Sequence, residues 1–321
     1  MLEVRNIRKY FPLSNGQRIQ AVNGVSFTVG ENEILGIVGE SGCGKSTLGR
    51  LILRLIEPSG GQVFFRGTEI TRLGRGAMKP MRANMQMIFQ NPFASFNPKI
   101  RIMGSLMEVC RYYGMGKVQS LERITGLLAD MGMAGDLLYH WPRELSGGQL
   151  QRLAIARALL SEPSLIIADE PLSSLDVSVQ AQLLNLLEDL RRRRSMMVLF
   201  ISHDMTVVEY FSDRIAVMYM GIIMELIPSA LLSGGAQHPY TKSLRASAPR
   251  LDVFKNQAGE EKGGQGILKG GILKGETPNP LLENSGCPFA PRCPEAVKRC
   301  SLELPELREV SANHQVRCWQ V

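Results

Sequence analysis

The sequence lacks an apolar run long enough to cross a bilayer. The longest candidate, residues 215–227, is interrupted by Gly221 and Glu225, whereas a spanning helix needs about 20 apolar residues. Residues 1–5 lack the apolar core of a signal peptide. We therefore expect a chain that is neither secreted nor membrane-spanning by itself.

Aromatic residues are scarce, at 6% of the 321 residues, although the formal net charge is +7. A nucleic-acid surface would need that charge on one face with aromatic residues between. The densest basic run, residues 191–194, follows an apolar-periodic stretch at 179–190. It therefore fits a solvated helix C-terminus, where cations suit the helix dipole. Contact with an anionic membrane surface is the alternative, and we expect no nucleic-acid partner.

The length predicts one large domain with an appendage. Composition changes near residue 235, so we expect a main domain at 1–235 and a second at 236–321. Residues 257–275 are rich in Gly and Lys and repeat Gly-Ile-Leu-Lys-Gly in tandem at 266–270 and 271–275. We interpret that segment as a linker.

Three short apolar segments, 34–38, 165–168 and 196–201, predict buried parallel strands that each end in a polar or Gly-rich turn. With helical patterns between them, they predict an α/β fold with a ligand at the carboxyl ends of the strands. Segments 4–10 and 22–29 predict an antiparallel β edge, and residues 91–160 predict a helical insertion.

Residues 39–46 fit the phosphate-loop pattern G-x-x-x-x-G-K-[ST], between a predicted strand and a predicted helix. Glycines let backbone N–H groups surround phosphate oxygens, and the helix N-terminus adds a positive dipole. Lys45 is expected to reach the β- and γ-phosphates, and Ser46 to ligate Mg²⁺. The alternative is a Gly-rich turn without a ligand. The predicted ATP-binding residues of this segment are Gly39, Ser41, Gly42, Cys43, Gly44, Lys45, Ser46 and Thr47.

Two acids follow the second predicted strand. We expect Asp169 to hold Mg²⁺ through water and Glu170 to act as general base. Taken alone, such a pair also fits a helix cap, but the phosphate loop upstream favours the catalytic interpretation. His203 ends the third strand. It is predicted to contact the γ-phosphate, the alternative being a structural histidine.

A second anion-binding turn, Ser146-Gly147-Gly148-Gln149, precedes the helical pattern at 150–160. Together with Gln90, Asp169-Glu170, Asp176 and His203, it makes residues 1–235 resemble an ABC-type ATPase. The resemblance implies a RecA-like core, an N-terminal antiparallel β subdomain and a helical subdomain at about 91–160.

The resemblance also implies a head-to-tail pair of ATPase domains. Ser146, Gly147, Gly148 and Gln149 would then complete a partner's ATP site, and Asp176 would lie at the dimer seam. Gln90 would sense Mg²⁺ and the attacking water, and would link the site to a membrane subunit. Phe11 would stack on adenine, with Tyr10 as second candidate. The alternative for Phe11 is an edge-strand core residue.

A narrower resemblance to the oligopeptide/dipeptide/nickel importer branch extends over nearly the whole chain. The similar segments are 90–98, 176–182, 238–241 and 286–294. It implies peptide uptake, or nickel or metal-chelate uptake as the alternative. It also implies a second homologous ATPase, two transmembrane permease subunits, an extracytoplasmic binding protein and a place at the cytoplasmic face of the cell membrane. The tandem repeat and the apolar residues 288–290 depart from the branch.

Two other classes of protein are alternatives to a transport ATPase. Soluble ABC ATPases of ribosomes usually hold two ATPase domains, and those of DNA repair a long coiled coil; this sequence has one domain and no sustained heptads. A non-hydrolysing nucleotide-binding module is opposed by Glu170 and His203.

Four cysteines, Cys287, Cys293, Cys300 and Cys318, lie in the last tenth of the sequence. No C-x₂₋₄-C pair typical of structural zinc occurs among them, whereas an iron–sulfur cluster accepts wider spacing. The branch resemblance also favours a [4Fe–4S] cluster. The alternatives are zinc, with His314 as a substitute ligand, and free thiols. We expect the tail to be structural and to keep away from the γ-phosphate.

Overall fold

The computed structural model describes residues 1–14, 16–172, 175, 177–248 and 286–321. It comprises two compact units. Unit 1 contains Met1–Val29, Ile34–Thr71 and Phe200–Val321, and unit 2 contains Gly30–Glu33 and Arg72–Leu199. The predicted linker at 257–275 lies outside the described residues. No helix in the described ranges is long and apolar enough to span a membrane.

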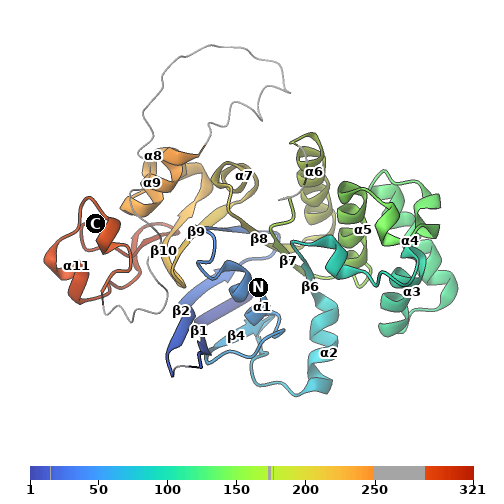
Figure 1. The fold of residues 1–321 in the computed structure, drawn as a ribbon, viewed down its shortest axis with the longest axis horizontal. Helices are drawn as coiled ribbons and strands as arrows, with labels where there is room; N and C mark the ends of the chain where they lie inside the picture. The colour runs from blue at the N-terminus through green and yellow to red at the C-terminus, as the bar shows by residue number, and fades with distance from the viewer. Residues whose placement is uncertain (15, 173–174, 176, 249–285) are drawn as a thin grey trace, which may run out of the picture. The chain divides into compact units, whose positions relative to one another are not determined.

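Unit 1 begins with an antiparallel sheet of strand order β2-β1-β4-β5, in the blue part of Figure 1. Alternate residues of the first strand, among them Leu2 and Val4, are fully buried, which gives the period-two pattern of a strand with one core face. The predicted antiparallel edge is therefore confirmed. The strands are β1 (Leu2–Pro12), β2 (Arg18–Val29), β4 (Gly60–Phe65) and β5 (Thr68–Glu69).

The second sheet of unit 1 has the strand order β11-β12-β10-β9-β3. β3 pairs in parallel with β9, and β9 pairs antiparallel with β10. All five residues of β3 are buried, as its continuous apolar run predicts. The strands are β3 (Ile34–Val38), β9 (Arg214–Tyr219), β10 (Ile222–Pro228), β11 (Arg308–Ser311) and β12 (His314–Val316).

The cysteine-rich tail adds two strands to this sheet, since β12 pairs with β10 and β11 pairs with β12. The described tail therefore belongs to the same compact unit as β3. The α-helices of the unit are α1 (Lys45–Ile52), α7 (Met205–Phe211), α8 (Leu232–Gly235), α9 (Pro239–Ser247) and α11 (Lys298–Leu302). Its 3₁₀ helices are η4 (Ser229–Leu231) and η6 (Ala290–Arg292).

Unit 2 holds the helical insertion predicted at 91–160. Successive helices α3, α4 and α5 pack together (Figure 1), and the inner face of α4 buries Ile124, Leu127 and Leu128 at helical spacing. The α-helices are α2 (Arg75–Asn84), α3 (Ile102–Tyr112), α4 (Lys117–Asp130), α5 (Gly147–Leu159) and α6 (Val177–Arg194). The 3₁₀ helices are η1 (Pro92–Ser95), η2 (Gly135–Tyr139) and η3 (Pro142–Glu144).

The other two predicted strands also form. β6 (Met85–Ile88) pairs in parallel with β7 (Leu165–Asp169), whose residues are all buried. β8 (Met197–Ser202) is buried throughout; its first three residues belong to unit 2 and its last three to unit 1.

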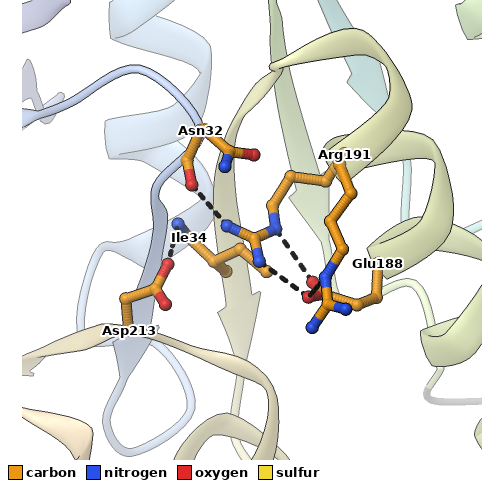
Figure 2. Close-up of polar contacts among 6 residues, drawn as sticks. Asn32, Ile34, Glu188, Arg191 and Asp213 are labelled. Carbon is orange, nitrogen blue, oxygen red and sulfur yellow. Dashed lines mark hydrogen bonds and ion pairs between the residues drawn. The ribbon is translucent and has the colours of Figure 1, made fainter.

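The basic run at 191–194 ends α6, as predicted, but Arg191 is buried rather than solvated. Its guanidinium donates to both carboxylate oxygens of Glu188, at 2.8 and 2.6 Å, and to the carbonyl of Asn32 (Figure 2). The prediction of a solvated helix end is therefore wrong for Arg191, because the Glu188 carboxylate and the Asn32 carbonyl take the place of water around its guanidinium. Within unit 1, the Asp213 carboxylate accepts from the Ile34 N–H at 2.7 Å, at the start of β3 (Figure 2).

Candidate nucleotide-binding site

The predicted phosphate loop lies between β3 and α1 in unit 1. Gly44 forms the N-cap of α1 at φ 103°, and a Cβ there would collide with the carbonyl oxygen of Ala21. Only glycine adopts that conformation in that space without strain. The strand–loop–helix context that the motif requires is therefore present.

Lys45 is buried against its own loop. Its ammonium donates to the carbonyl oxygens of Gly39, at 2.8 Å, and Glu40, at 2.9 Å. Cys43 is also buried, and burial raises the pKa of its thiol. Ser46 lies half-buried in the first turn of α1, and its predicted role toward Mg²⁺ stays a prediction.

The two aromatic candidates for adenine stacking differ in their surroundings. The Tyr10 hydroxyl donates to Asn23 Oδ1 at 3.1 Å. The Phe11 side chain is 37% exposed, with the Lys9 ammonium 5.0 Å from its ring centroid. That exposure argues against the core alternative for Phe11, while adenine stacking remains a prediction.

His203 is exposed and follows the last residue of β8. The next residue, Asp204, caps α7 by accepting from the Thr206 N–H at 2.8 Å. This cap fixes the chain directly after His203. Its contact with the γ-phosphate stays a prediction.

In unit 2, the two predicted catalytic acids lie where β7 ends. Asp169 is buried as the last residue of the strand. Glu170 has φ 46°, a left-handed backbone conformation that is uncommon for residues other than glycine. Its carboxylate accepts from Gln90 Nε2 at 2.8 Å. Two side chains that were both predicted to contact the attacking water are therefore hydrogen-bonded, although 80 positions separate them.

The predicted signature turn caps α5. Ser146 Oγ accepts from the Gln149 N–H at 3.3 Å, and Gln149 Oε1 accepts from the Ser146 N–H at 3.0 Å. This capping box gives Gln149 a structural role that the sequence analysis missed, although the S-x-x-Q spacing was a signal for it. Ser146 and Gly147 are exposed, as a surface for a partner's nucleotide requires. Asp176, predicted at the dimer seam, lies outside the described residues.

The four tail cysteines line one cavity of about 10 Å³, which is room for about one water molecule. They are free thiols, and burial raises the pKa of Cys287 to about 11. Among the described residues, no group of three or more His, Cys, Asp or Glu side chains is arranged to hold a metal ion. His314, the predicted substitute ligand, instead pairs with the buried carboxylate of Glu225 at 2.8 Å.

The tail also contacts the predicted phosphate loop. Arg292 Nη1 lies 3.0 Å from each carboxylate oxygen of Glu40. The tail therefore reaches the loop itself, because Arg292 and Glu40 meet although 252 positions separate them. The expectation that the tail keeps away from the γ-phosphate stays a prediction. No local sequence pattern could have indicated that pairing.

These features define a nucleotide-binding cassette, and comparisons with known proteins agree. The family model described as "ABC transporter" matches residues 22–173, and that of the "Oligopeptide/dipeptide transporter, C-terminal region" matches residues 224–300. The chain belongs to the oligopeptide/dipeptide branch of the ABC transporter ATP-binding proteins.

Two curated relatives match nearly end to end. The oligopeptide transport ATP-binding protein AppF of Bacillus subtilis is 44% identical over 326 residues, covering 99% of this chain and 96% of that protein. A putative peptide import ATP-binding protein of Brucella ovis is 43% identical over 319 residues, covering 99% of this chain and 97% of that protein.

Among solved structures, the dimeric ATP-binding cassette MJ0796, in a post-hydrolysis state with ADP and Pi, matches with a TM-score of 0.66. It is 27% identical and covers 71% of this chain and 99% of its own. The predicted ABC-type α/β fold is therefore confirmed.

Proposed function

We propose that this chain binds Mg²⁺-ATP at residues 39–46 and hydrolyses it to power peptide import through membrane subunits. The observation that carries the proposal is the loop between β3 and α1, where Gly44 caps the helix and the Lys45 ammonium is buried against the loop carbonyls. A lysine at a helix N-terminus surrounded by backbone N–H groups is suited to the β- and γ-phosphates of a nucleotide.

The residues proposed for hydrolysis follow the template of phosphate-loop ATPases. Ser46 and Asp169 would hold the Mg²⁺, Asp169 through water, and the ion would neutralise charge on the phosphate oxygens. Glu170 would accept a proton from the attacking water as general base. Its hydrogen bond to Gln90 supports a shared role, with Gln90 also sensing Mg²⁺. His203 would contact the γ-phosphate.

The nucleotide site is proposed to need a second cassette. The exposed Ser146 and Gly147 turn at the N-terminus of α5 presents backbone N–H groups suited to an anion outside this chain. A homologous ATPase subunit would supply the same turn in return, with Asp176 at the seam. Two permease subunits and an extracytoplasmic binding protein would complete the importer, at the cytoplasmic face of the membrane.

Peptides are the proposed cargo. Relatives matched over 99% of this chain are named for oligopeptide transport and peptide import, and the model matching 224–300 is that of an oligopeptide/dipeptide transporter. Nickel or a metal chelate is the alternative, which a transport assay with both cargoes distinguishes.

We further propose that the four tail thiols bind a [4Fe–4S] cluster, a group usually held by four cysteine thiolates. The convergence of all four, from a span of 32 positions, on one cavity supports this donor set. Because the cavity now has room for about one water, loading requires the thiols to move apart. Since burial raises the pKa of Cys287 to about 11, loading should also release protons.

The cluster proposal is tested by anaerobic purification of the full chain. About four irons per chain and a brown colour are expected. Both should be lost in Cys300→Ser and kept in Cys110→Ser, whose thiol is equally buried but lies in α3. Stoichiometric zinc, or ordered protein without metal, would contradict the cluster.

The nucleotide proposal is tested by binding of a fluorescent ATP analogue with Mg²⁺ to the full chain. Lys45→Ala should weaken binding about tenfold to hundredfold, as expected for lost charge-assisted hydrogen bonds. Lys117→Ala, which changes an exposed lysine at the start of α4, should bind like the unaltered chain. Equal binding by the two variants would refute the site.

A further inference from the structure

Glu40 is the second residue of the predicted phosphate loop. Its carboxylate, its carbonyl and its backbone N–H each form hydrogen bonds. Its carboxylate accepts from Arg292 Nη1 at 3.0 Å to each oxygen, and its carbonyl accepts from Lys45 Nζ at 2.9 Å. Its N–H donates to the hydroxyl of Tyr240 at 3.1 Å. Two of these three partners, Arg292 and Tyr240, come from residues beyond 235 rather than from the loop.

The Arg292–Glu40 pair is largely removed from water. The Arg292 side chain is 7% exposed and that of Glu40 is 18% exposed. Arg292 Nη1 also lies 3.2 Å from the hydroxyl of Tyr219 in β9. Nη1 alone contacts both carboxylate oxygens, and such charge-assisted hydrogen bonds are stronger than bonds between neutral groups. Removal of either partner leaves a poorly solvated charge behind.

An aromatic cluster of Phe289, Tyr219 and Tyr240 anchors the turn that bears Arg292. Phe289 is fully buried, with its ring centroid 5.5 Å from that of Tyr219 and 5.2 Å from that of Tyr240. The Arg292 N–H donates to the Phe289 carbonyl at 3.0 Å. The cluster therefore positions the two partners of Glu40 that lie outside the loop. These are the Arg292 guanidinium and the Tyr240 hydroxyl.

We propose that Arg292 is a positioning residue of the nucleotide site, which acts through Glu40 and makes ATP affinity depend on the folded tail. The inference rests on the proposed assignment of residues 39–46 to the ATP phosphates. It assigns the tail a role in nucleotide binding that is independent of what its cysteines hold.

The physical basis is pre-organisation. To reach a phosphate, Lys45 must release the carbonyls of Gly39 and Glu40, to which it now donates. Arg292 and Tyr240 hold Glu40 without Lys45, so the loop keeps its form while the ammonium changes partners. Less ordering then has to accompany ATP binding, which raises affinity. Because Glu170 is untouched, the effect should appear in Kd and KM rather than in kcat.

The test compares full-length variants for binding of the fluorescent ATP analogue, and for kcat and KM in the assembled transporter. Arg292→Ala should raise Kd and KM roughly tenfold, the scale of one charge-assisted contact. Arg292→Lys keeps the charge but not the planar group, and should recover part of the loss. The matched control is Arg299→Ala in the same tail, where Arg299 pairs with Glu303 at 3.1 Å and both are more than half exposed. The Kd of Arg299→Ala for the ATP analogue should differ from that of the unaltered chain by less than about twofold.

A double-mutant comparison keeps the test valid if Arg292→Ala loosens the whole tail. Glu40→Gln should raise Kd similarly, and the double variant should be no worse than either single variant, since both remove one interaction. Fully additive effects, equal effects of Arg292→Ala and Arg299→Ala, or an unchanged Kd would overturn the proposal. Lys45→Ala is measured alongside. If ATP binding survives that change, the loop assignment itself fails; if only the Arg292 variants behave normally, the positioning role alone fails.

Discussion

At the residue scale, Glu170 combines an uncommon backbone conformation with a hydrogen bond to a second candidate for the attacking water. Residues held at positive φ cluster at functional sites because the surrounding structure must maintain them. Glu170 has the further advantage of following a strand buried at every position. The carboxylate is therefore presented from a rigid element, as a general base requires.

Glu170→Gln should bind ATP normally but hydrolyse it about a hundredfold or more slowly, the typical contribution of a general base. Single-turnover hydrolysis in the assembled transporter measures this. Glu162→Gln is the matched control, because Glu162 is also a glutamate at positive φ, 51°, but is exposed and pairs with Arg123 at 2.7 Å. An unaltered rate in Glu170→Gln would remove Glu170 from the chemistry.

The buried imidazole of His238 should make unfolding pH-dependent. Burial, followed by the nearby charge of Lys242, lowers its pKa from 6.5 to about 4. The folded state thus binds fewer protons than the unfolded state in that range. The contribution of His238 to the free energy of unfolding should be fully present above pH 6.5. It should be lost as the pH drops toward 4, by on the order of 3 kcal/mol.

Urea unfolding at pH 7, 6 and 5 checks this, with His238→Asn as the comparison. His238 Nδ1 accepts from the Tyr240 N–H at 3.0 Å at the start of α9, and asparagine also caps helices. The variant should lose less stability between pH 7 and 5 than the unaltered chain. Parallel pH profiles would show that His238 is not the responsible group.

How far the sequence predicts this site depends on how local each feature is. The loop 39–46, the acids at the end of β7 and the turn at 146–149 are each contiguous, so a short pattern can indicate them. The contacts of Arg292 with Glu40 and of His314 with Glu225 join positions 252 and 89 apart. They arise from sheet pairing and aromatic packing, which no short motif encodes.

At the element scale, long or uniformly apolar segments were the predictable ones. β3 has the predicted bounds, β7 is one residue longer at its C-terminal end, and β8 begins and ends one residue later than predicted. The strands β11 and β12 were not predicted, because segments of four and three residues show little periodicity. β12 pairs with β10 and β11 pairs with β12, and this pairing joins the tail to the second sheet of unit 1.

The start of α5 yields a prediction at this scale. Ser146→Arg should leave ATP binding at the chain's own loop intact while lowering hydrolysis by the assembled transporter at least about tenfold, because a bulky cation would block the partner's nucleotide. Thr125→Arg, on the exposed surface of α4, should change neither quantity. Both variants need a stability measurement, since loss of the cap costs about 1 kcal/mol.

The head-to-tail arrangement would be contradicted if Ser146→Arg kept its stability but no longer bound ATP at its own loop. That result would mean that the turn serves its own chain, against the head-to-tail arrangement. Full hydrolysis by the assembled Ser146→Arg transporter would contradict it equally.

At the scale of the whole molecule, the residues proposed for nucleotide binding and hydrolysis are divided between the two units. Unit 1 holds the phosphate loop and unit 2 holds the predicted base and the turn for a partner's nucleotide. None of the helices described is suited to spanning a membrane. Because the proposed function gives each nucleotide site a turn from a second cassette, isolated protein should hydrolyse ATP slowly.

The most direct test of this account is ATP-dependent uptake of a labelled peptide by proteoliposomes that contain this chain, its partner ATPase, both permeases and the binding protein. Uptake should require ATP on the side of the cassettes, should cease with Lys45→Ala and persist with Lys117→Ala, and should exceed uptake of nickel. Peptide uptake that continues unchanged with Lys45→Ala would contradict the account.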